Sequence, residues 1–122
     1  MTQRQILEKR LDDLIRDIIK GRDTGSPCIT CGKTLTPENI TAGHFMKRRH
    51  LATRWNTLNV NGQCWKCNGE DDADLYEEAM IRRYGATITE NIKKMARSAV
   101  HYTNEDLTTV YHELKRYQEK YA

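Results

Sequence analysis

The chain has 122 residues and a formal net charge of +3, with 30% charged and 7% aromatic residues. This length predicts one compact domain with a modest, partly helical core. No apolar run long enough to cross a membrane occurs, and the N-terminal residues lack the apolar stretch of a signal peptide, which argues against a membrane protein. We therefore expect reduced thiols in a cytoplasm rather than disulfides.

The N-terminal segment predicts an amphipathic helix over residues 4–20. Its apolar residues recur at helical spacing, with charged residues on the opposite side; they are Ile6, Leu7, Leu11, Leu14, Ile15 and Ile18. Gly21 ends the helix, and residues 23–27 form a turn. We therefore expect an N-terminal helix within residues 1–22.

The middle of the chain, residues 23–85, is expected to be one unit with little regular structure. Glycines and a proline interrupt any periodicity between residues 28 and 61. This pattern indicates a zinc knuckle followed by two short strands, around residues 40–45 and 58–61. A helix over residues 72–84 follows, and Gly85 closes it.

The C-terminal segment, residues 86–122, predicts two more helices. Thr87 and Glu90 have the spacing of a capping box and mark the start of one helix, and Thr103 marks the start of the other. Together these elements predict an α+β fold in which an N-terminal helix and a C-terminal helical bundle frame a small central core.

Four cysteines form two C-x-x-C pairs, Cys28 with Cys31 and Cys64 with Cys67. Each pair can place two thiolates on one ion, and two pairs complete the tetrahedron that Zn²⁺ accepts. The 32 residues between the pairs exceed the length of a simple turn and must contain structure of their own. We therefore expect one structural zinc ion that holds a structured loop.

The loop between the cysteine pairs is basic. Residues 39–69 contain no Asp or Glu, whereas six acidic residues fall within residues 70–78. A local basic face can neutralise phosphates even when the whole chain is nearly balanced in charge. We expect contacts with the DNA backbone from Lys47, Arg48, Arg49 and Arg54.

Phosphodiester hydrolysis needs a base for water, positive charge for the developing phosphorane and a group that orients both. His44, Asn59 and Asn68 occur in the basic segment or at its end and match these needs. Each also has a simpler explanation. His44 could be an ordinary core or surface histidine, Asn59 a turn residue, and Asn68 a helix N-cap, which Asn favours.

The order of these three residues resembles the HNH, or ββα-metal, endonuclease motif, in which zinc-stapled members carry two C-x-x-C pairs at the base of the motif. The resemblance implies that His44 is the general base and that Asn59 orients it. It also implies that Asn68, at the start of the motif's helix, is a ligand to a catalytic Mg²⁺ or Mn²⁺ ion.

A wider resemblance covers most of the chain. Five segments are similar to the NinG/Rap family of phage recombination endonucleases. They are Ala-Gly-His-Phe (residues 42–45), Arg-Trp-Asn (54–56), the segment from Asn59 to Asn68, Arg-Tyr-Gly (83–85) and Tyr-Thr-Asn-Glu-Asp-Leu (102–107). The family implies structure-selective cleavage of branched DNA, such as Holliday junctions and D-loops, in the host cell cytoplasm. Arg54 matches a position of this family and is therefore the first candidate to clamp the scissile phosphate, since its guanidinium can pair with two phosphate oxygens. Symmetric cutting of a junction needs two active sites, so we expect a homodimer joined through the N-terminal or the last helix.

One position departs from the HNH pattern. Many HNH enzymes have a metal-binding Asp or His directly before the base, where this chain has Gly43. The ion could be held by Asn68, water and substrate alone, or a further side chain could take part; the candidates are Glu70, Asp71, Asp72 and His50, of which Asp72 is retained as the second candidate ligand. The same gap supports the alternative of a non-catalytic zinc module that binds DNA or a recombination partner.

Overall fold

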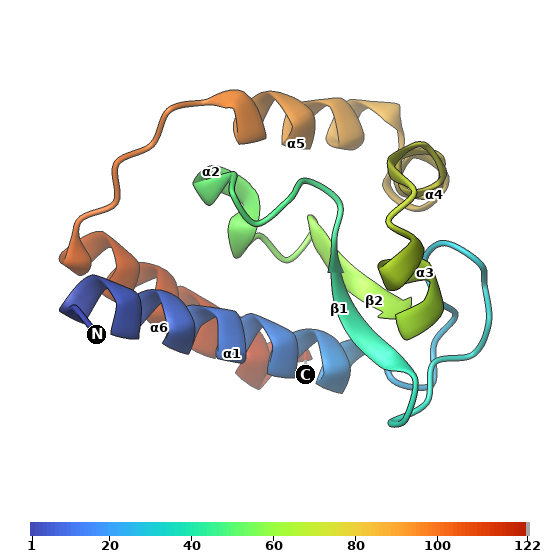
Figure 1. Cartoon of the computed structure of the whole chain (residues 1–122), viewed down its shortest axis with the longest axis horizontal. Helices are drawn as coiled ribbons and strands as arrows, with labels where there is room; N and C mark the ends of the chain where they lie inside the picture. The colour runs from blue at the N-terminus through green and yellow to red at the C-terminus, as the bar shows by residue number, and fades with distance from the viewer. Residues whose placement is uncertain (122) are drawn as a thin grey trace.

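A computed structural model describes residues 1–121 of the chain. A two-stranded antiparallel sheet, β1 (Ile40–His44) and β2 (Val60–Cys64), lies at the centre. Two long helices, α1 (Gln3–Asp23) and α6 (Asn104–Tyr121), lie side by side beneath it in the view of Figure 1, and the shorter helices lie above and beside it. The fold is therefore a mixture of helices with one small sheet, as the sequence predicts.

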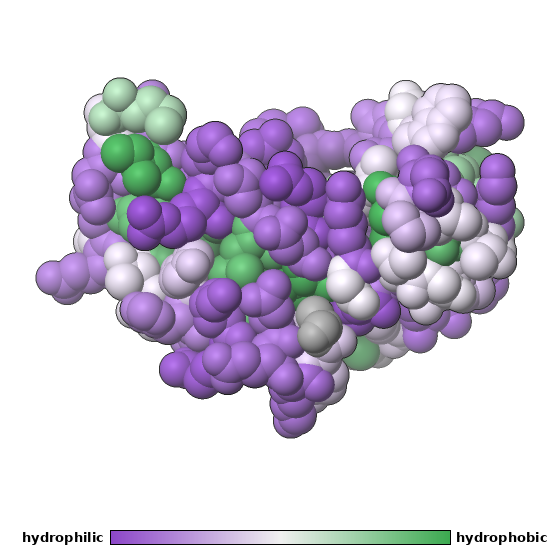
Figure 2. Space-filling view, turned by 90° about the horizontal axis from the view of Figure 1, so that it is seen from below, coloured by the Kyte–Doolittle hydropathy of each residue, from purple (hydrophilic) through white to green (hydrophobic). Residues whose placement is uncertain are grey.

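Helix α1 forms because its two faces differ and because its start is capped. It does not end at Gly21 as predicted but continues to Asp23, and the Thr24 N–H still donates to the Lys20 carbonyl at 3.2 Å. The Thr2 side chain accepts a hydrogen bond from the Gln5 backbone and the Gln5 side chain returns one, which is a capping box. The apolar stripe of α1 packs against α6 and the sheet, and the shared core includes Leu11, Ile15 and Leu107. Seen from below, hydrophilic side chains cover most of the surface, and apolar side chains show in its middle and in smaller groups towards its left and right ends (Figure 2).

The two strands are in register from Ile40, which pairs with Cys64, to His44, which pairs with Val60. The prediction for the first strand is confirmed to within one residue. The second strand lies further along the chain than residues 58–61, because Asn56 holds the preceding residues in a turn. Its Oδ1 accepts hydrogen bonds from the backbone N–H groups of residues 58 and 59 at 2.8 and 3.2 Å.

Three short helices surround the sheet. α2 (Leu51–Arg54) lies in the β1–β2 connection and was not expected from the sequence. α3 (Trp65–Glu70) follows β2 directly. α4 (Ala73–Tyr84) begins one residue after its predicted start, because the side chain of Asp72 caps it from outside by accepting a hydrogen bond from the Leu75 backbone.

The two C-terminal helices do not form the predicted bundle. α5 (Ala86–Arg97) packs against α4 and α2, whereas α6 packs along α1 on the opposite side of the sheet (Figure 1). Each helix buries its apolar stripe against a different partner, so one bundle could not satisfy both. The predicted capping box at Thr87 is also wrong, because α5 begins after Gly85, which lies at φ 91° in a conformation that favours glycine.

The start of α6 is confirmed. Thr103 and Asp106 exchange backbone-to-side-chain hydrogen bonds at 2.9 and 3.0 Å, which is the reciprocal pattern of a capping box. Over residues 1–121, none of the helices combines the length and the apolar character needed to span a bilayer.

Candidate zinc site and histidine cleft

The four cysteines come together in space. Their sulfur atoms all lie within 4.8 Å of one another, and Cys31 Sγ is 3.9 Å from Cys64 Sγ. A tetrahedral zinc ion with Zn–S bonds of about 2.3 Å would separate its sulfurs by roughly 3.8 Å. The thiol set therefore fits one zinc ion in both chemistry and spacing.

Backbone hydrogen bonds build the first half of this site. The Cys28 N–H donates to the Lys33 carbonyl at 2.7 Å, and the Gly32 N–H donates to the Cys28 carbonyl at 2.9 Å. Gly32 lies at φ 80°, where residues with a Cβ are disfavoured. The turn therefore needs a glycine directly after Cys31.

The second half of the site is where β2 meets α3. Cys64 ends the strand and occupies the N-cap position of the helix, without a side-chain capping bond, and Cys67 lies in the first turn of that helix. Burial opposes ionisation of Cys28, but backbone N–H groups, including that of Cys64, lower the pKa of the Cys28 thiol to about 7. Burial raises the pKa of Cys67. Four thiolates in this space repel one another, so a cation is needed to ionise them together.

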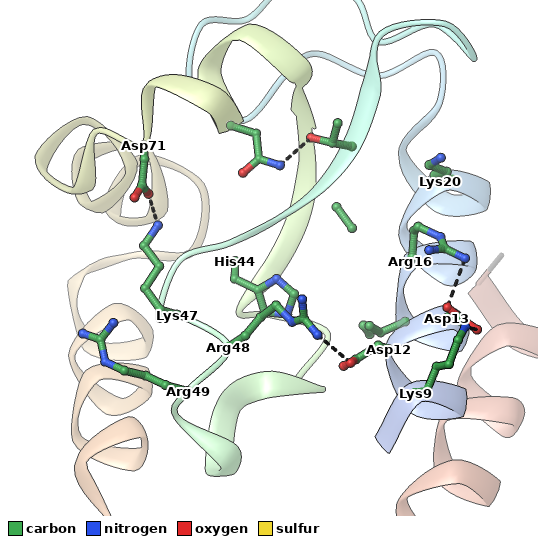
Figure 3. A pocket seen from close by; sticks show the side chains of 14 residues that line it. Lys9, Asp12, Asp13, Arg16, Lys20, His44, Lys47, Arg48, Arg49 and Asp71 are labelled. Atoms are coloured by element: carbon green, nitrogen blue, oxygen red, sulfur yellow. Dashed lines mark hydrogen bonds and ion pairs between the residues drawn. The ribbon is translucent and has the colours of Figure 1, made fainter. Parts of the chain in front are cut away.

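A cleft of about 1020 Å³ opens beside the sheet, between α1 and the segment that follows β1. Six basic and three acidic side chains line it, together with His44 and Asn68; the charged residues are Lys9, Arg16, Lys20, Lys47, Arg48, Arg49, Asp12, Asp13 and Asp71. Figure 3 shows His44 between the helix that carries Asp12 and the segment that carries Lys47. The cleft therefore has a basic excess around a single histidine.

His44 is held in one tautomer. Its Nε2 lies 2.9 Å from the backbone carbonyl oxygen of Arg54, and a carbonyl only accepts hydrogen bonds, so the proton is on Nε2. The neutral ring then presents Nδ1 as an acceptor. Burial lowers the pKa of His44, the bond to the carbonyl opposes this, and the charges of Arg48 and Arg54 lower it further. A neutral imidazole with a free lone pair is the form that a general base requires.

Asn59 is fully buried and holds the loop after β1. Its Oδ1 accepts from the Met46 N–H at 2.8 Å, and its Nδ2 donates to the carbonyls of Met46 and Thr53, both at 3.0 Å. These bonds fix the two ends of the segment between His44 and Arg54. Asn59 thus acts on the backbone around His44 rather than through a hydrogen bond to the ring.

Asn68 and His44 line the same cleft, as the sequence predicts. Asn68 is not at the start of its helix, however, because α3 begins at Trp65 and Cys64 is its N-cap. The alternative that Asn68 is an N-cap is therefore wrong. Its Nδ2 donates to Thr41 Oγ1 at 3.1 Å, which orients the amide and leaves the amide oxygen as a potential ligand.

The acidic residues after Asn68 differ in position. Asp72, the retained second ligand candidate, is not in the cleft and uses its carboxylate to cap α4. Asp71 does line the cleft, with φ 54°, and forms an ion pair with Lys47. Glu70 lies 4.0 Å from Lys66, and His50 is not among the lining residues. Of these four candidates, only Asp71 lines the cleft together with Asn68.

Gly43 is a glycine for a steric reason. A Cβ at this position would lie 2.1 Å from Gln63 Oε1 and 3.0 Å from Gln63 Cβ. Gln63 is itself buried and donates to Thr30 Oγ1 at 2.8 Å. The Gly43 carbonyl accepts from the hydroxyl of Tyr76 on α4 at 2.7 Å. Position 43 is thus packed against other parts of the chain, and a carboxylate there would not enter the cleft without displacing Gln63.

The four predicted DNA contacts are not equivalent. The guanidinium of Arg54 is only 15% exposed, and its Nε and Nη2 pair with the two oxygens of Asp12 at 3.0 and 2.6 Å. It is therefore engaged within the protein rather than free to clamp a phosphate as predicted. Arg48, 60% exposed, shares Asp12 Oδ2 at 2.7 Å, while Lys47 pairs with Asp71 and Arg49 projects at the edge of the cleft.

The sequence did not point to α1 as a wall of the cleft. Lys9, Asp12, Arg16 and Lys20 line it, and they lie on the charged face of the N-terminal helix. In the sequence that face is indistinguishable from a solvated surface. No spacing rule separates Asp12 from the other acidic residues of the helix.

A protein-family model described as "Bacteriophage Lambda NinG protein" matches residues 1–121. The chain belongs to the NinG family. It is 32% identical over 88 residues to protein ninG of Escherichia phage lambda, which covers 70% of this chain and 43% of that protein. Protein ninG of Salmonella phage P22 is 31% identical over the same shares. The chain therefore spans less than half the length of these relatives, and no solved structure matches it.

Proposed function

We propose that this NinG-family protein is a metal-dependent endonuclease of the HNH type that cleaves branched DNA. The observation that supports this most directly is His44, a neutral histidine held in one tautomer at the centre of a basic cleft. A DNA-binding module needs basic side chains, but it does not need a hydrogen bond that determines which imidazole nitrogen is free.

The order of the surrounding elements supports the same proposal. β1, β2 and α3 follow one another as strand, strand and helix, with His44 at the end of the first strand and Asn68 in the helix. The four-cysteine cluster ties the end of β2 to the start of that helix. Zinc would therefore hold the two walls of the cleft that carry His44 and Asn68 at a constant separation.

In this proposal, His44 takes the proton from the attacking water through Nδ1, and the hydrogen bond to the Arg54 carbonyl stabilises the imidazolium that results. A Mg²⁺ or Mn²⁺ ion would supply charge for the phosphate oxygens, with the Asn68 amide oxygen and the Asp71 carboxylate as its protein ligands. Within residues 1–121, only the cysteines form a group of three or more His, Cys, Asp or Glu side chains able to hold an ion. A site with only two protein ligands suits Mg²⁺, because this ion keeps several waters and binds substrate phosphate.

The DNA backbone would contact the exposed basic residues at the mouth of the cleft. Arg48 replaces Arg54 as the first candidate, because Asp12 would still be neutralised by Arg54 if Arg48 moved to a phosphate. Lys47 and Arg49 extend the basic edge. Such contacts position a substrate without reading its sequence, which suits an enzyme that selects a branched shape.

The preference for Holliday junctions or D-loops rests on the resemblance to phage recombination endonucleases. Cutting both strands of a junction needs two active sites, so a homodimer on DNA is part of the proposal. The apolar stripes of α1 and α6 pack on each other and are not free to join two copies. Light scattering of the protein with and without a junction would measure the stoichiometry.

The proposal is tested with a synthetic four-way junction and a linear duplex of the same sequence, incubated with the zinc-loaded protein. We expect Mg²⁺ or Mn²⁺ to support cleavage of the junction faster than of the duplex, and EDTA to stop it. Tight binding of the junction without cleavage under any of these ions would instead establish the alternative, a non-catalytic zinc module.

A further inference from the structure

Asp12 on α1 accepts more hydrogen bonds than any other carboxylate at the cleft. Its Oδ1 accepts from Arg54 Nε at 3.0 Å and from Trp55 Nε1 at 2.9 Å, and its Oδ2 accepts from Arg54 Nη2 at 2.6 Å and from Arg48 Nη2 at 2.7 Å. Burial opposes ionisation, but the bonds from Arg54 and Trp55 outweigh it and lower the pKa of Asp12. The charged carboxylate on α1 therefore holds Arg54 and Trp55, two consecutive residues that are far from it in the sequence.

Those two residues include the one that holds His44. Arg54 ends α2, and its backbone carbonyl accepts the hydrogen bond from His44 Nε2 at 2.9 Å. Trp55 is buried in the core that α1 shares with β2, and the guanidinium of Arg54 lies 5.1 Å from the centre of its ring. Asp12 thus fixes both side chains that flank the peptide unit to which this carbonyl belongs.

A four-residue helix does not determine this position without help. α2 has no side-chain cap at its N-terminus, and isolated helices of one turn are unstable. Asn59 holds the Thr53 carbonyl from one side, and Asp12 holds residues 54 and 55 from the other. The Arg54 carbonyl lies between these two supports.

We infer that Asp12 is a positioning residue: through Arg54 and Trp55 it keeps the Arg54 carbonyl where it holds the proton of His44 on Nε2, leaving Nδ1 free. Its catalytic consequence rests on the proposed nuclease function, but the state of the imidazole does not. The two can therefore fail separately.

The first measurement is nitrogen NMR of the histidine rings in the zinc-loaded protein, with the His44 signals assigned by their loss in His44→Ala. We expect the parent to show His44 as the Nε2–H tautomer with a slowly exchanging proton. Asp12→Asn, which puts an amide against the Arg54 donors, should give a mixture of tautomers and fast exchange. Asp17→Asn is the matched control, because Asp17 lies on the same helix and only approaches Arg16 at 4.0 Å. It should leave the signals unchanged.

Two further variants separate positioning from general stability. Arg54→Gln removes the guanidinium but keeps the carbonyl, and should disturb the tautomer as Asp12→Asn does, with no additional effect in the double variant. Arg48→Ala removes a donor to Asp12 that does not flank the carbonyl, and should leave the tautomer as it is. If Asp12→Asn does not fold, Arg54→Gln carries the same test.

The second measurement is cleavage of the junction. Asp12→Asn should lower kcat by roughly tenfold to a hundredfold with KM within about threefold, as expected for a misplaced reacting group, whereas Asp17→Asn should match the parent. An unchanged His44 tautomer in both Asp12→Asn and Arg54→Gln would overturn the inference, whatever the rates. A changed tautomer in a protein that does not cleave would uphold it and remove the nuclease proposal instead.

Discussion

The cysteine cluster and the His44 cleft are built in different ways, although β2 and α3 join them. All four sulfur atoms of the cluster come from two short motifs with identical spacing. The cleft is open, and its walls come from α1, β1, the segment after β1, and α3. Its key contacts join residues that are 10 to 43 positions apart, from His44 with Arg54 to Asp12 with Trp55.

The two regions therefore depend on the rest of the fold to different extents. The cluster needs only two tight turns and one cation, so it should survive most changes elsewhere in the chain. The cleft needs the long helix, the loop and the knuckle in place together. Changes to the cluster should therefore abolish both regions, whereas changes to the cleft should leave the cluster intact.

The largest effect is expected from Cys64→Ser. Cys64 ends β2, occupies the N-cap position of α3 and donates its backbone N–H to Cys28 Sγ, so losing its thiol removes one candidate zinc ligand where the two regions join. Structural zinc sites contribute about 10–16 kcal/mol of apparent binding free energy. We expect loss of zinc and of cooperative unfolding, measured by metal analysis and thermal denaturation. A parent protein without zinc, or with a native Cys28–Cys31 disulfide, would contradict this.

His44→Ala should abolish cleavage at the cleft and leave the cysteine cluster intact. Loss of a general base lowers the rate by about 10² to 10⁴, while zinc content and junction affinity stay near the parental values because the basic side chains remain. Single-turnover cleavage and a binding titration would measure the two separately. Cleavage within threefold of the parent would remove His44 from the role of base.

Gly43→Asp tests whether the position before His44 can serve as a metal ligand at all. The new Cβ collides with Gln63, so we expect a loss of about 1–3 kcal/mol in the free energy of unfolding and no gain in Mg²⁺ affinity. Adding Gln63→Ala should recover part of the loss. Gly69→Ala is the control, because a Cβ there meets nothing within 4 Å. Full stability together with tighter Mg²⁺ binding would show that position 43 reaches the cleft.

Asn68→Ala should raise the Mg²⁺ or Mn²⁺ concentration for half-maximal cleavage by roughly tenfold, within the range seen when support of a metal is lost. DNA affinity should change little. Asn68→Asp should preserve or tighten metal binding, because a carboxylate is the better ligand for a hard cation. Should Asp71→Asn shift the metal dependence while Asn68→Ala does not, the ligand is Asp71.

The smallest effect concerns pH. Burial lowers the pKa of His44 below its ordinary value of 6.5, so the folded protein favours the neutral ring. The stability that this contributes is fully present above pH 6.5 and is lost as the pH falls through the folded-state pKa. Cleavage should follow the same direction, with a plateau at neutral pH. An NMR titration of His44 with a midpoint above 6.5 would contradict it.

Local patterns were enough for the elements whose causes are local. The capping of α6, the first strand, the four-cysteine set and the stripe of α1, apart from the exposed Ile6, follow from capping chemistry, ligand spacing and periodicity, and these predictions are confirmed in position. The predicted start of α5 failed because Gly85 and the packing on α4 outweighed a capping pattern at Thr87. The shift of β2 came from the Asn56 turn.

The amino-acid pattern was sufficient for the presence of a zinc-type cysteine set, for a histidine among basic residues, and for the family, because each depends on residue types at short spacing. The arrangement of the cleft depends instead on long-range packing. In the fold, position 43 faces Gln63, Asp72 caps a helix while Asp71 lines the cleft, and Arg54 pairs with Asp12. These outcomes depend on contacts between side chains that are far apart in the sequence. The spacing of residues along the chain does not predict such contacts.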